Sequence, residues 1–485
     1  MYYIGVDLGT SAVKLLLMEE SGKIEKIVSK EYPLFFPHPG WSEQNPQDWM
    51  RETMAGIKEL TEDIDKTKVA GIGCGGQMHG LVTLDERDEV IRPAILWNDG
   101  RTGEETDYLN TVIGKDKLSG YTANIAFAGF TAPKILWMKK NEPENFARVK
   151  KIMLPKDYLA YCMTGSFCTD LSDASGMLLL DVKNRCWSKE MLDICGITEE
   201  QLPALYESWQ VVGSLKPEIA AELGLSQDVK FVAGAGDNAA AAVGTGTVGD
   251  GQCNISLGTS GTVFISSREF GVDENNALHS FDHADGRYHL MGCMLSAASC
   301  NKWWSEEILN TKDFAKEQEG IVKLGENQVF FLPYLMGERS PHNNPDARAV
   351  FFGMSMDTSR AEMTQAVLEG VAFGLRDSLE VARSLGIHIE RTKICGGGAK
   401  SPLWKKIIAN VMNLKVDVPA VEEGPSMGGA MLAAVGCGAY PDVETIAEKF
   451  VHVVETVEPE PELVAKYEER YQKFKKLYPV MKELF

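Results

Sequence analysis

Short apolar runs recur along the chain, and glycines and polar residues follow each of them at once. Runs of this length that end in turn-forming residues predict buried strands, because helices need longer stretches with apolar positions three and four residues apart. The strand-like runs lie at residues 3–8, 69–76, 94–97, 230–234, 253–257 and 392–395.

Longer segments carry the spacing of helices. Asn45-Pro46 supplies a cap residue and a proline at the first helical position, which predicts a helix from there to about residue 61. Residues 359–385 predict a long helix. From Leu463 to Met481, apolar and aromatic residues three and four positions apart predict an amphipathic helix that packs on a second domain.

Two further helices consist almost entirely of small residues, 239–246 and 426–436. Small side chains let backbones approach closely, as a hinge shared by two domains requires. Strands and helices therefore follow one another along the whole chain, which is typical of an α/β fold.

The first strand ends in a turn that combines a carboxylate with glycine and hydroxyl groups, Asp7-Leu8-Gly9-Thr10-Ser11. Such a turn exposes backbone N–H groups to an anion, and the carboxylate beside it can hold a metal ion. An ordinary β-hairpin with a polar turn would have the same local pattern.

The pattern occurs again half a chain later, where the turn Gly258-Thr259-Ser260 interrupts the apolar run 253–265. After each turn comes a strand that ends in a glycine cluster, and then a small-residue helix. Features repeated in the same order predict two similar α/β domains that face each other across a cleft. The expected domains are residues 1–247 and 248–485.

Composition narrows the class of protein. The 485 residues are 44% hydrophobic and 24% charged, as in globular proteins, and the net charge of −20 argues against a nucleic-acid partner. The 10 cysteines form no CxxC pair, so neither a disulfide framework nor a zinc ribbon is indicated. Since no signal peptide and no apolar run of about 18 residues is found, we expect a soluble, cytoplasmic protein without a membrane span.

The two hydroxyl-rich turns are suited to grip nucleotide phosphates, although the chain has neither a P-loop nor an N-terminal GxGxxG motif. Gly396-Gly397-Gly398-Ala399 carries no bulky side chain, so a base or ribose could lie against its backbone. A tight strand-to-helix turn is the alternative explanation for these glycines.

Two carboxylates, Asp7 and Asp237, stand at glycine-rich strand ends. Phosphoryl transfer needs a metal ion to neutralise phosphate charge and a base to accept a hydroxyl proton. Asp7, beside a phosphate turn, suits the metal, and Asp237, beside Asn238, suits the base. Asp237 would also serve as the N-cap of the alanine-rich helix.

Three histidines, His279, His283 and His289, match no usual zinc spacing. The Asp-Gly pair between the last two predicts a hairpin turn instead.

The residues together resemble the actin-like ATPase superfamily and, within it, the FGGY carbohydrate kinases. Residues 129–137 resemble the first family signature, and residues 349–354 continuing to 362–370 resemble the second. The similarity extends over essentially the whole chain. Strings such as Gln77-Met78-His79-Gly80 and Gly236-Asp237-Asn238 narrow it to the members that act on D-xylulose.

This resemblance implies phosphorylation of the 5-hydroxyl of D-xylulose by ATP and Mg²⁺. Asp237 would be the general base, and Asp7, with Asp237, would organise the metal. Ala12 and Ala235 replace glycines found in related sequences, but neither change removes a functional group. The sugar would contact Met78, His79, Trp97, Asn98, Asp99 and Asn238, and ATP would contact Gly9, Thr10, Ser11, Gly258, Thr259, Ser260, Gly396, Gly397, Gly398 and Ala399.

Two alternatives remain open at this point. The acceptor could be another ketose or polyol, such as L-ribulose, glycerol or gluconate, because isomers differ by a few hydrogen bonds that sequence alone does not position. The chain could also be an actin-like filament or chaperone ATPase, although the polar and aromatic residues at its strand ends favour a sugar pocket. We expect small-molecule partners, no nucleic acid and no membrane, and a homodimer is compatible with the sequence.

Overall fold

A computed structural model describes residues 1–420 and 423–485, which form two compact units. Unit 1 contains residues 1–248 together with the later segments 280–288 and 423–451. Unit 2 contains the described residues of 249–279, 289–420 and 452–485. The first division follows residue 248, next to the expected boundary, whereas the return of two later segments to unit 1 has no counterpart in the sequence prediction.

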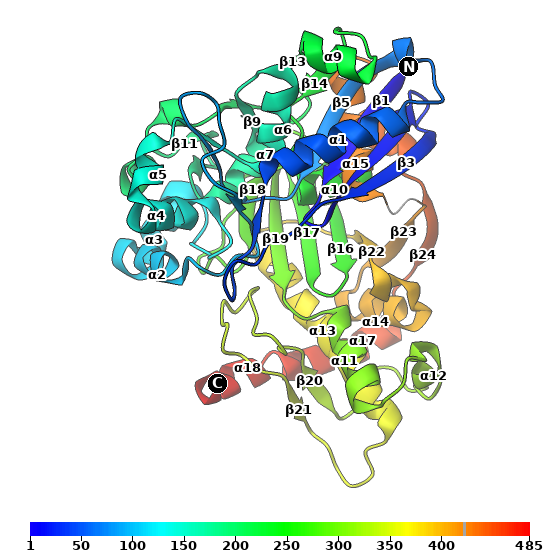
Figure 1. Cartoon of the computed structure of the whole chain (residues 1–485). Helices are drawn as coiled ribbons and strands as arrows, with labels where there is room; N and C mark the ends of the chain where they lie inside the picture. Colours follow the sequence, from blue (N-terminus) through cyan, green and yellow to red (C-terminus); the bar gives the residue numbers. More distant parts are fainter. Residues whose placement is uncertain (421–422) are drawn as a thin grey trace. The chain divides into compact units, whose positions relative to one another are not determined.

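A seven-stranded mixed sheet forms the centre of unit 1 (Figure 1). β1 (Tyr2–Leu8) pairs antiparallel with β2 (Ala12–Glu19) and parallel with β5 (Val69–Gly76). The sheet order is β13-β14-β5-β1-β2-β3, and β15 continues beside β5. The remaining strands are β3 (Ile24–Glu31), β13 (Val211–Ser214), β14 (Lys230–Val232) and β15 (Ala235–Gly236).

The sheet of unit 2 repeats this arrangement. β16 (Cys253–Leu257) pairs antiparallel with β17 (Gly261–Ser267) and parallel with β22 (Arg391–Cys395), as β1 does with β2 and β5. The order β19-β17-β16-β22-β23-β24 matches β3-β2-β1-β5-β14-β13 strand for strand. The internal repeat predicted from the sequence is therefore confirmed. The other strands are β19 (Tyr288–Met294), β23 (Lys415–Pro419) and β24 (Val453–Val457).

The two small-residue helices, α10 (Asp237–Gly244) and α15 (Gly424–Gly436), pack against each other within unit 1. A Cβ atom on Gly428 would lie 1.9 Å from the carbonyl oxygen of Ala240, and one on Gly244 would lie 2.0 Å from that of Gly424. α15 also lies on the sheet, where a Cβ on Gly5 of β1 would lie 1.7 Å from the carbonyl oxygen of Ser426. The predicted close backbone approach is confirmed.

Other helices follow their predicted starts. α1 (Pro46–Leu60) begins at the expected proline, and α13 (Arg360–Ser384) begins at a capping box formed by Ser359 and Glu362. The C-terminal segment forms two helices, α17 (Pro461–Phe474) and α18 (Leu477–Met481), where one was predicted. Pro479 has no N–H to donate to the carbonyl of residue 475, which explains the break.

Smaller elements complete both units, and the 94–97 run yields only the two-residue strand β7 (Ala94–Ile95). Short sheets pair β4 (Glu43–Gln44) with β7, β6 (Val82–Leu84) with β8 (Lys151–Met153), β9 (Cys168–Asp170) with β12 (Ala204–Tyr206), β10 (Leu180–Asp181) with β11 (Cys186–Trp187), and β20 (Phe330–Leu332) with β21 (Val350–Phe352). The remaining helices include α2 (Gly103–Asp107), α3 (Lys115–Thr122), α4 (Thr131–Asn141), α5 (Pro143–Arg148), α6 (Pro155–Thr164), α7 (Leu171–Ala174), α8 (Lys189–Cys195), α9 (Pro217–Leu223), α11 (Ala298–Trp303), α12 (Phe314–Glu319), α14 (Pro402–Met412) and α16 (Val443–Phe450).

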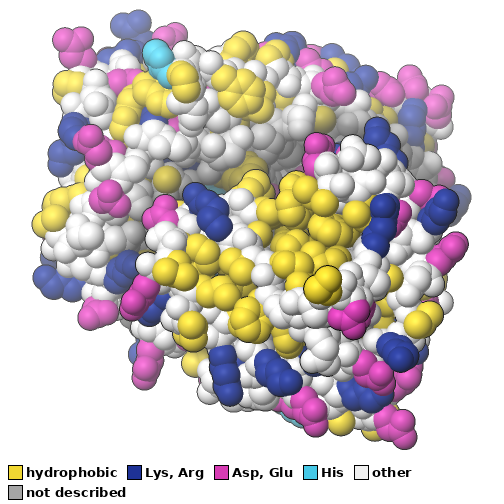
Figure 2. Space-filling model, turned by 90° about the horizontal axis from the view of Figure 1, so that it is seen from below, with side chains coloured by type: hydrophobic (Ala, Val, Ile, Leu, Met, Phe, Trp, Pro, Cys, Tyr) yellow, Lys and Arg dark blue, Asp and Glu magenta, His cyan; other side chains and the backbone are white. Residues whose placement is uncertain are grey.

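Hydrophobic side chains gather on one face of unit 2, as Figure 2 shows from below. Exposed apolar residues near β21 and at α18 include Phe352, Met354 and Val480, which are 49%, 56% and 77% exposed. Contiguous apolar surface is typical of sites where another surface binds. Within the described ranges, no helix is long and apolar enough to cross a lipid bilayer.

Candidate active site

Asp7 and the strand that leads to Asp237 lie on opposite sides of β5 in the unit 1 sheet. Asp7 of β1 is in register with Gly75 of β5, and Ala235 of β15 pairs with Gly75 from the other side. Adjacent strands lie about 4.8 Å apart, so the backbones of Asp7 and Ala235 are about 10 Å apart. Asp237 follows two residues later as the first residue of α10; the N-cap is Gly236, so the predicted N-cap role of Asp237 is wrong.

The pKa values of both carboxyl groups are raised. Burial, with the negative charge of Asp7, raises the pKa of Asp237 to about 7, although the Asn238 N–H donates to its Oδ1 at 2.7 Å. Burial also raises the pKa of Asp7 to about 6, while Lys14 acts in the opposite direction. A carboxyl group with a pKa near neutrality is suited to accept a proton from a hydroxyl group.

Lys14 is a basic residue of this site that the sequence prediction did not include. It stands opposite Asp7 in the β1–β2 register, and its ammonium lies 2.9 Å from Glu423 Oε2. Half-exposed beside the turn, it places positive charge where the sequence predicts phosphate. Its position three residues past Ser11, on a strand facing Asp7, is the signal that could have identified it.

The turn between β1 and β2 is held by side chains from elsewhere in unit 1. Gln77 Nε2 donates to the Gly9 carbonyl at 3.2 Å, and Trp97 Nε1 donates to Thr10 Oγ1 at 2.9 Å. Tyr32 also donates to the Gly9 carbonyl, and its backbone N–H donates to the Ser11 carbonyl. Since these contacts engage turn carbonyls and one hydroxyl, the turn is fixed in place.

Two predicted sugar ligands, Met78 and Asn238, lie together. Asn238 Nδ2 is 3.9 Å from Met78 Sδ, and the same amide donates to Asp237 Oδ1 at 3.0 Å. The structure therefore brings Met78, Asp237 and Asn238 to one place.

His79 adopts a left-handed backbone conformation with φ of 68°. Its Nδ1 lies 2.7 Å from the Gly176 carbonyl oxygen, and its ring packs 4.7 Å from that of Phe130. Lys134, fully buried, donates to the His79 carbonyl at 2.8 Å, and burial lowers the pKa of its ammonium well below the usual range. The 129–137 signature thus supports the loop that carries His79.

The three predicted sugar ligands of the 97–99 segment differ in their exposure to solvent. Trp97 is 47% exposed, and Asn98 is also exposed, whereas Asp99 is buried. Both Asp99 oxygens accept from the Arg101 guanidinium, at 2.9 and 2.7 Å, and Oδ2 also accepts from the Ser42 N–H at 2.6 Å. Groups of the protein itself therefore hydrogen-bond both carboxylate oxygens of Asp99. The predicted contact of Asp99 with the sugar stays a prediction.

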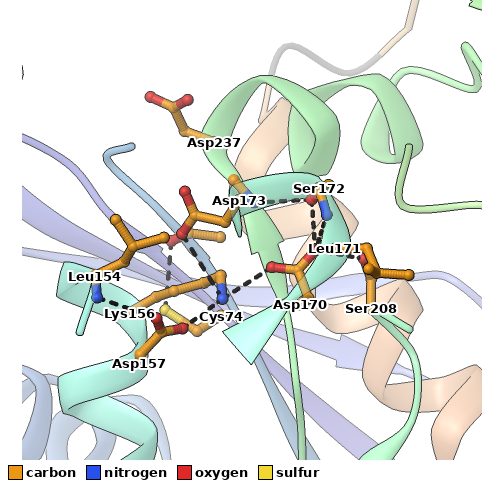
Figure 3. A network of polar contacts seen from close by, with 12 residues as sticks. Cys74, Leu154, Lys156, Asp157, Asp170, Leu171, Ser172, Asp173, Ser208 and Asp237 are labelled. Atoms are coloured by element: carbon orange, nitrogen blue, oxygen red, sulfur yellow. Dashed lines mark hydrogen bonds and ion pairs between the residues drawn. The ribbon is translucent and has the colours of Figure 1, made fainter. Parts of the chain in front are cut away.

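A buried cluster of charges lies next to Asp237 (Figure 3). The Lys156 ammonium is 2.7 Å from Asp157 Oδ1, 2.8 Å from Asp170 Oδ1 and 3.7 Å from Asp173 Oδ2. Burial raises the pKa of Asp173 well above its usual range, with Asp237 among the charges that add to this shift. Sequence reasoning missed this cluster entirely.

Unit 2 contains a cavity of about 820 Å³ formed by two of the predicted ATP elements. Gly258 and Thr259 line it together with Gly397 and Gly398. Ser260, Gly396 and Ala399 are not among its lining residues. Its other walls combine apolar and polar groups that the sequence prediction had not named: Phe314, Trp404, Ser299, Asn301, Lys302, Gln318 and Ser401.

The glycines of this pocket differ in their surroundings. Gly396 adopts φ of 91°, and a Cβ on Gly398 would lie 2.5 Å from the Leu257 side chain, so both are needed for the backbone path. A Cβ on Gly397 meets nothing within 4 Å. Gly397 is therefore open toward a ligand, while Gly396 and Gly398 make the tight turn.

The three histidines do not form one site. His283 Nε2 lies 2.9 Å from the Thr247 carbonyl, and the His289 ring stacks on Phe264. The predicted Asp-Gly turn is confirmed, since the His283 N–H donates to the Arg287 carbonyl at 2.8 Å. Among residues 1–420 and 423–485, no group of three or more His, Cys, Asp or Glu side chains could hold a metal ion.

The chemistry of the donor set nevertheless fits Mg²⁺. This ion is usually bound through one or two carboxylates, with waters and substrate phosphates filling its other positions. Asp7 and Asp237 are two carboxylates of this kind; burial, and secondly the charge of Asp7, raise the pKa of Asp237, and a bound cation would compensate both effects.

Comparison with known proteins decides the family. Models of the N-terminal and C-terminal domains of the FGGY family of carbohydrate kinases match residues 2–244 and 253–437. The chain belongs to the FGGY family of carbohydrate kinases. The duplicated sheets form the two-domain α/β fold of this family, which has the actin-like ATPase architecture. As a member of the family, the chain is an ATP-dependent sugar kinase.

Individual FGGY kinases are similar over their full length. Xylulose kinase from Escherichia coli is 40% identical over 480 residues, 98% of each chain. The crystal structure of a xylulose kinase from Brucella ovis is 40% identical, covers 100% of both chains and superposes with a TM-score of 0.95. Gluconate kinase from Lactobacillus acidophilus has a TM-score of 0.94 at 27% identity, covering 99% of this chain and 98% of that one.

Proposed function

We propose that this FGGY kinase phosphorylates D-xylulose on its 5-hydroxyl, using ATP and Mg²⁺, in the breakdown of D-xylose in the cytoplasm. The observation that carries the proposal is full-length similarity to xylulose kinases at 40% identity, combined with the grouping of Met78, Asp237 and Asn238 at one strand end. Gluconate is the weaker candidate substrate, because relatives at 40% identity are xylulose kinases, while the gluconate kinase is 27% identical, no more than a xylulose kinase from the same organism.

Asp237 would accept the proton of the 5-hydroxyl as that oxygen attacks the γ-phosphorus. Its raised pKa, near 7, matches this task, because a base works best with a pKa near the operating pH. Asn238 would hold Asp237 through the two hydrogen bonds to Oδ1 and would face the sugar. Met78, His79, Trp97, Asn98 and Asp99 would form the rest of the sugar site.

Mg²⁺, when bound, would neutralise the charge of the phosphates. Asp7 would hold it together with Asp237. The backbone N–H groups of the turns Gly9-Thr10-Ser11 and Gly258-Thr259-Ser260 would bind phosphate oxygens. Adenosine would occupy the 820 Å³ cavity of unit 2, against Gly397 and Gly398, with Trp404 and Phe314 as its apolar walls.

ADP release in a coupled assay, measured with and without each sugar, tests this function. We expect D-xylulose to accelerate ADP release strongly and to exceed L-ribulose, glycerol and gluconate in kcat/KM. A filament or chaperone ATPase would show no acceleration by any sugar. A preference for L-ribulose or glycerol would contradict the assignment of the substrate.

We further propose a homodimer. The apolar face in Figure 2 supports this, and so do exposed large apolar side chains of unit 2 such as Phe352 and Met354, because aromatic and methionine side chains are favoured in protein interfaces. A second copy of the chain carries the same apolar face, so the two could cover each other by two-fold symmetry.

A further inference from the structure

The buried charge cluster beside Asp237 is not explained by substrate binding or proton transfer. Lys156, Asp157, Asp170 and Asp173 are each at most 2% exposed. Removing charges from water costs several kcal/mol per ion, so a buried ion pair is weak evidence for a purely stabilising role. The cluster therefore calls for another explanation.

A chain of contacts leads from Lys156 to the backbone that precedes Asp237. Asp170 faces the Lys156 ammonium with Oδ1, and its Oδ2 accepts from the Ser172 hydroxyl at 2.5 Å. Because Ser172 donates its proton to a carboxylate, its oxygen is free to accept, and the Gly236 N–H donates to it at 3.2 Å. Figure 3 shows Lys156, Asp170 and Ser172 in this cluster, with Asp237 near it.

Besides Ser172, the backbone at this point is held by the pairing of β15 with β5 and by the Gly234 N–H, which donates to the Ser208 carbonyl at 2.9 Å. β15 contains only Ala235 and Gly236, and Gly234 before it has φ of 78°. Glycine is conformationally permissive, so residues 234–236 depend on contacts from outside for a single conformation. Asp237 follows immediately, and its carboxylate takes its position from this backbone.

We propose that Lys156, Asp170 and Ser172 are positioning residues that hold the Gly236 N–H and thereby aim the Asp237 carboxylate at the sugar hydroxyl. The inference rests on the proposed role of Asp237 as base. An error of about 1 Å in the placement of reacting groups can cost about 100-fold in rate. The Lys156 ammonium pairs with Asp170 Oδ1 at 2.8 Å, and Asp170 Oδ2 accepts the Ser172 proton, which leaves the Ser172 oxygen directed at the Gly236 N–H.

The chain offers a matched pair of variants. Ser172 and Ser208 are both buried, and both donate a hydroxyl proton to Asp170 Oδ2, at 2.5 and 2.8 Å. Only Ser172 also accepts from Gly236. Ser172→Ala and Ser208→Ala therefore remove the same kind of bond from Asp170, but only the first removes a hydrogen bond to Gly236, because the Ser208 carbonyl that accepts from Gly234 is kept in both variants.

The experiment measures kcat, the KM for sugar, the KM for ATP and the Tm of both variants and the parent. The acceptor is whichever sugar of the panel the parent phosphorylates best. We expect Ser172→Ala to lower kcat about tenfold or more with both KM values within about twofold. Ser208→Ala should keep kcat within about threefold of the parent at a comparable loss of Tm.

A parent-like kcat for Ser172→Ala, equal losses of kcat in both variants, or a loss confined to the KM for sugar would overturn the positioning role. These outcomes leave the proposed function intact. If the parent prefers a sugar other than D-xylulose, the proposed substrate is wrong, but the comparison of variants still decides this inference. No turnover with any sugar would overturn both.

Discussion

Replacement of Asp237 by asparagine should remove catalysis and increase stability at the same time. In the folded protein the pKa of Asp237 is raised from 3.8 to about 7, chiefly by burial. Between about pH 4 and pH 7 the folded state therefore retains a proton that the unfolded state has lost. The free energy of unfolding consequently falls as the pH rises through this window.

The size of the effect follows from the shift. Three pKa units at 1.36 kcal/mol each amount to about 4 kcal/mol of destabilisation, present in full above pH 7. The introduced asparagine would carry no charge, and its side-chain carbonyl can still accept from the Asn238 N–H. We expect the Asp237→Asn variant to be about 2–4 kcal/mol more stable than the parent at pH 8, which is roughly 5–10 °C in Tm for a unit of this size.

The assay is thermal unfolding from pH 5.5 to 8.5 in EDTA without nucleotide, so that no metal ion compensates the charge. The gain should fall by about half between pH 8 and pH 5.5. Asp107→Asn, at an exposed carboxylate of α2, serves as the control and should leave Tm nearly unchanged. In a separate activity assay of the same purified protein with ATP and Mg²⁺, kcat of Asp237→Asn should drop by about 10²–10⁴.

Two results would refute this reasoning. One is an Asp237→Asn variant that is no more stable than the parent at pH 8. The other is a stability difference that grows as the pH falls, which would mean that the carboxylate is stabilised rather than destabilised by its surroundings.

Three further substitutions have defined outcomes. Gly397→Val should raise the KM for ATP about tenfold or more and leave the KM for sugar unchanged, because the valine side chain would enter the cavity of unit 2 without touching protein. An unchanged KM for ATP would show that adenosine does not bind in this cavity. Gly428→Ala should prevent folding or lower the Tm sharply in thermal scans, since the new Cβ would lie 1.9 Å from the Ala240 carbonyl oxygen. The control Gly120→Ala should not lower the Tm, because a Cβ there meets nothing within 4 Å. Equal Tm values for the two variants would contradict the packing of α10 against α15. Phe352→Glu should convert the proposed dimer to a monomer in light scattering with the activity assay as a check on folding, and a dimer that persists would place the interface elsewhere.

The duplicated architecture could be predicted because it depends on local sequence patterns. Each half carries a strand, a hydroxyl-rich turn and a second strand, and these short-range features are what periodicity detects. Asp7 and Asp237 could be paired for the same reason, since each follows or ends a strand beside a glycine cluster. In the structure Asp7 pairs with Gly75 from one side and Ala235, two residues before Asp237, pairs with it from the other.

What could not be predicted depends on contacts between distant segments. α15 lies in the second half of the chain but packs on β1 and β5 of unit 1, because Gly5 and Gly73 leave room for its backbone. The Lys156 cluster joins α6 to the residues around Asp170, and no spacing rule marks such a group. Asp99 resembles a sugar ligand in sequence, and only the fold shows Arg101 and Ser42 occupying it.

The second family signature shows why a conspicuous motif need not carry chemistry. Residues 362–370 lie in α13, where a Cβ on Gly370 would lie 2.2 Å from the Phe331 carbonyl. The buried Glu369 pairs with Arg470 at 2.7 Å and accepts from Tyr467. This part of the signature therefore joins α13 to β20 and α17 in the core of unit 2.

A competition experiment tests the central claim most directly. The enzyme is given ATP, Mg²⁺ and an equimolar mixture of D-xylulose, L-ribulose, glycerol and gluconate, and ³¹P NMR identifies the phosphorylated products and the carbon that bears each phosphate. Because all acceptors compete for one enzyme, the initial product ratio equals the ratio of their kcat/KM values. We predict that D-xylulose 5-phosphate dominates the spectrum; a spectrum dominated by another product, or by inorganic phosphate alone, would contradict the account.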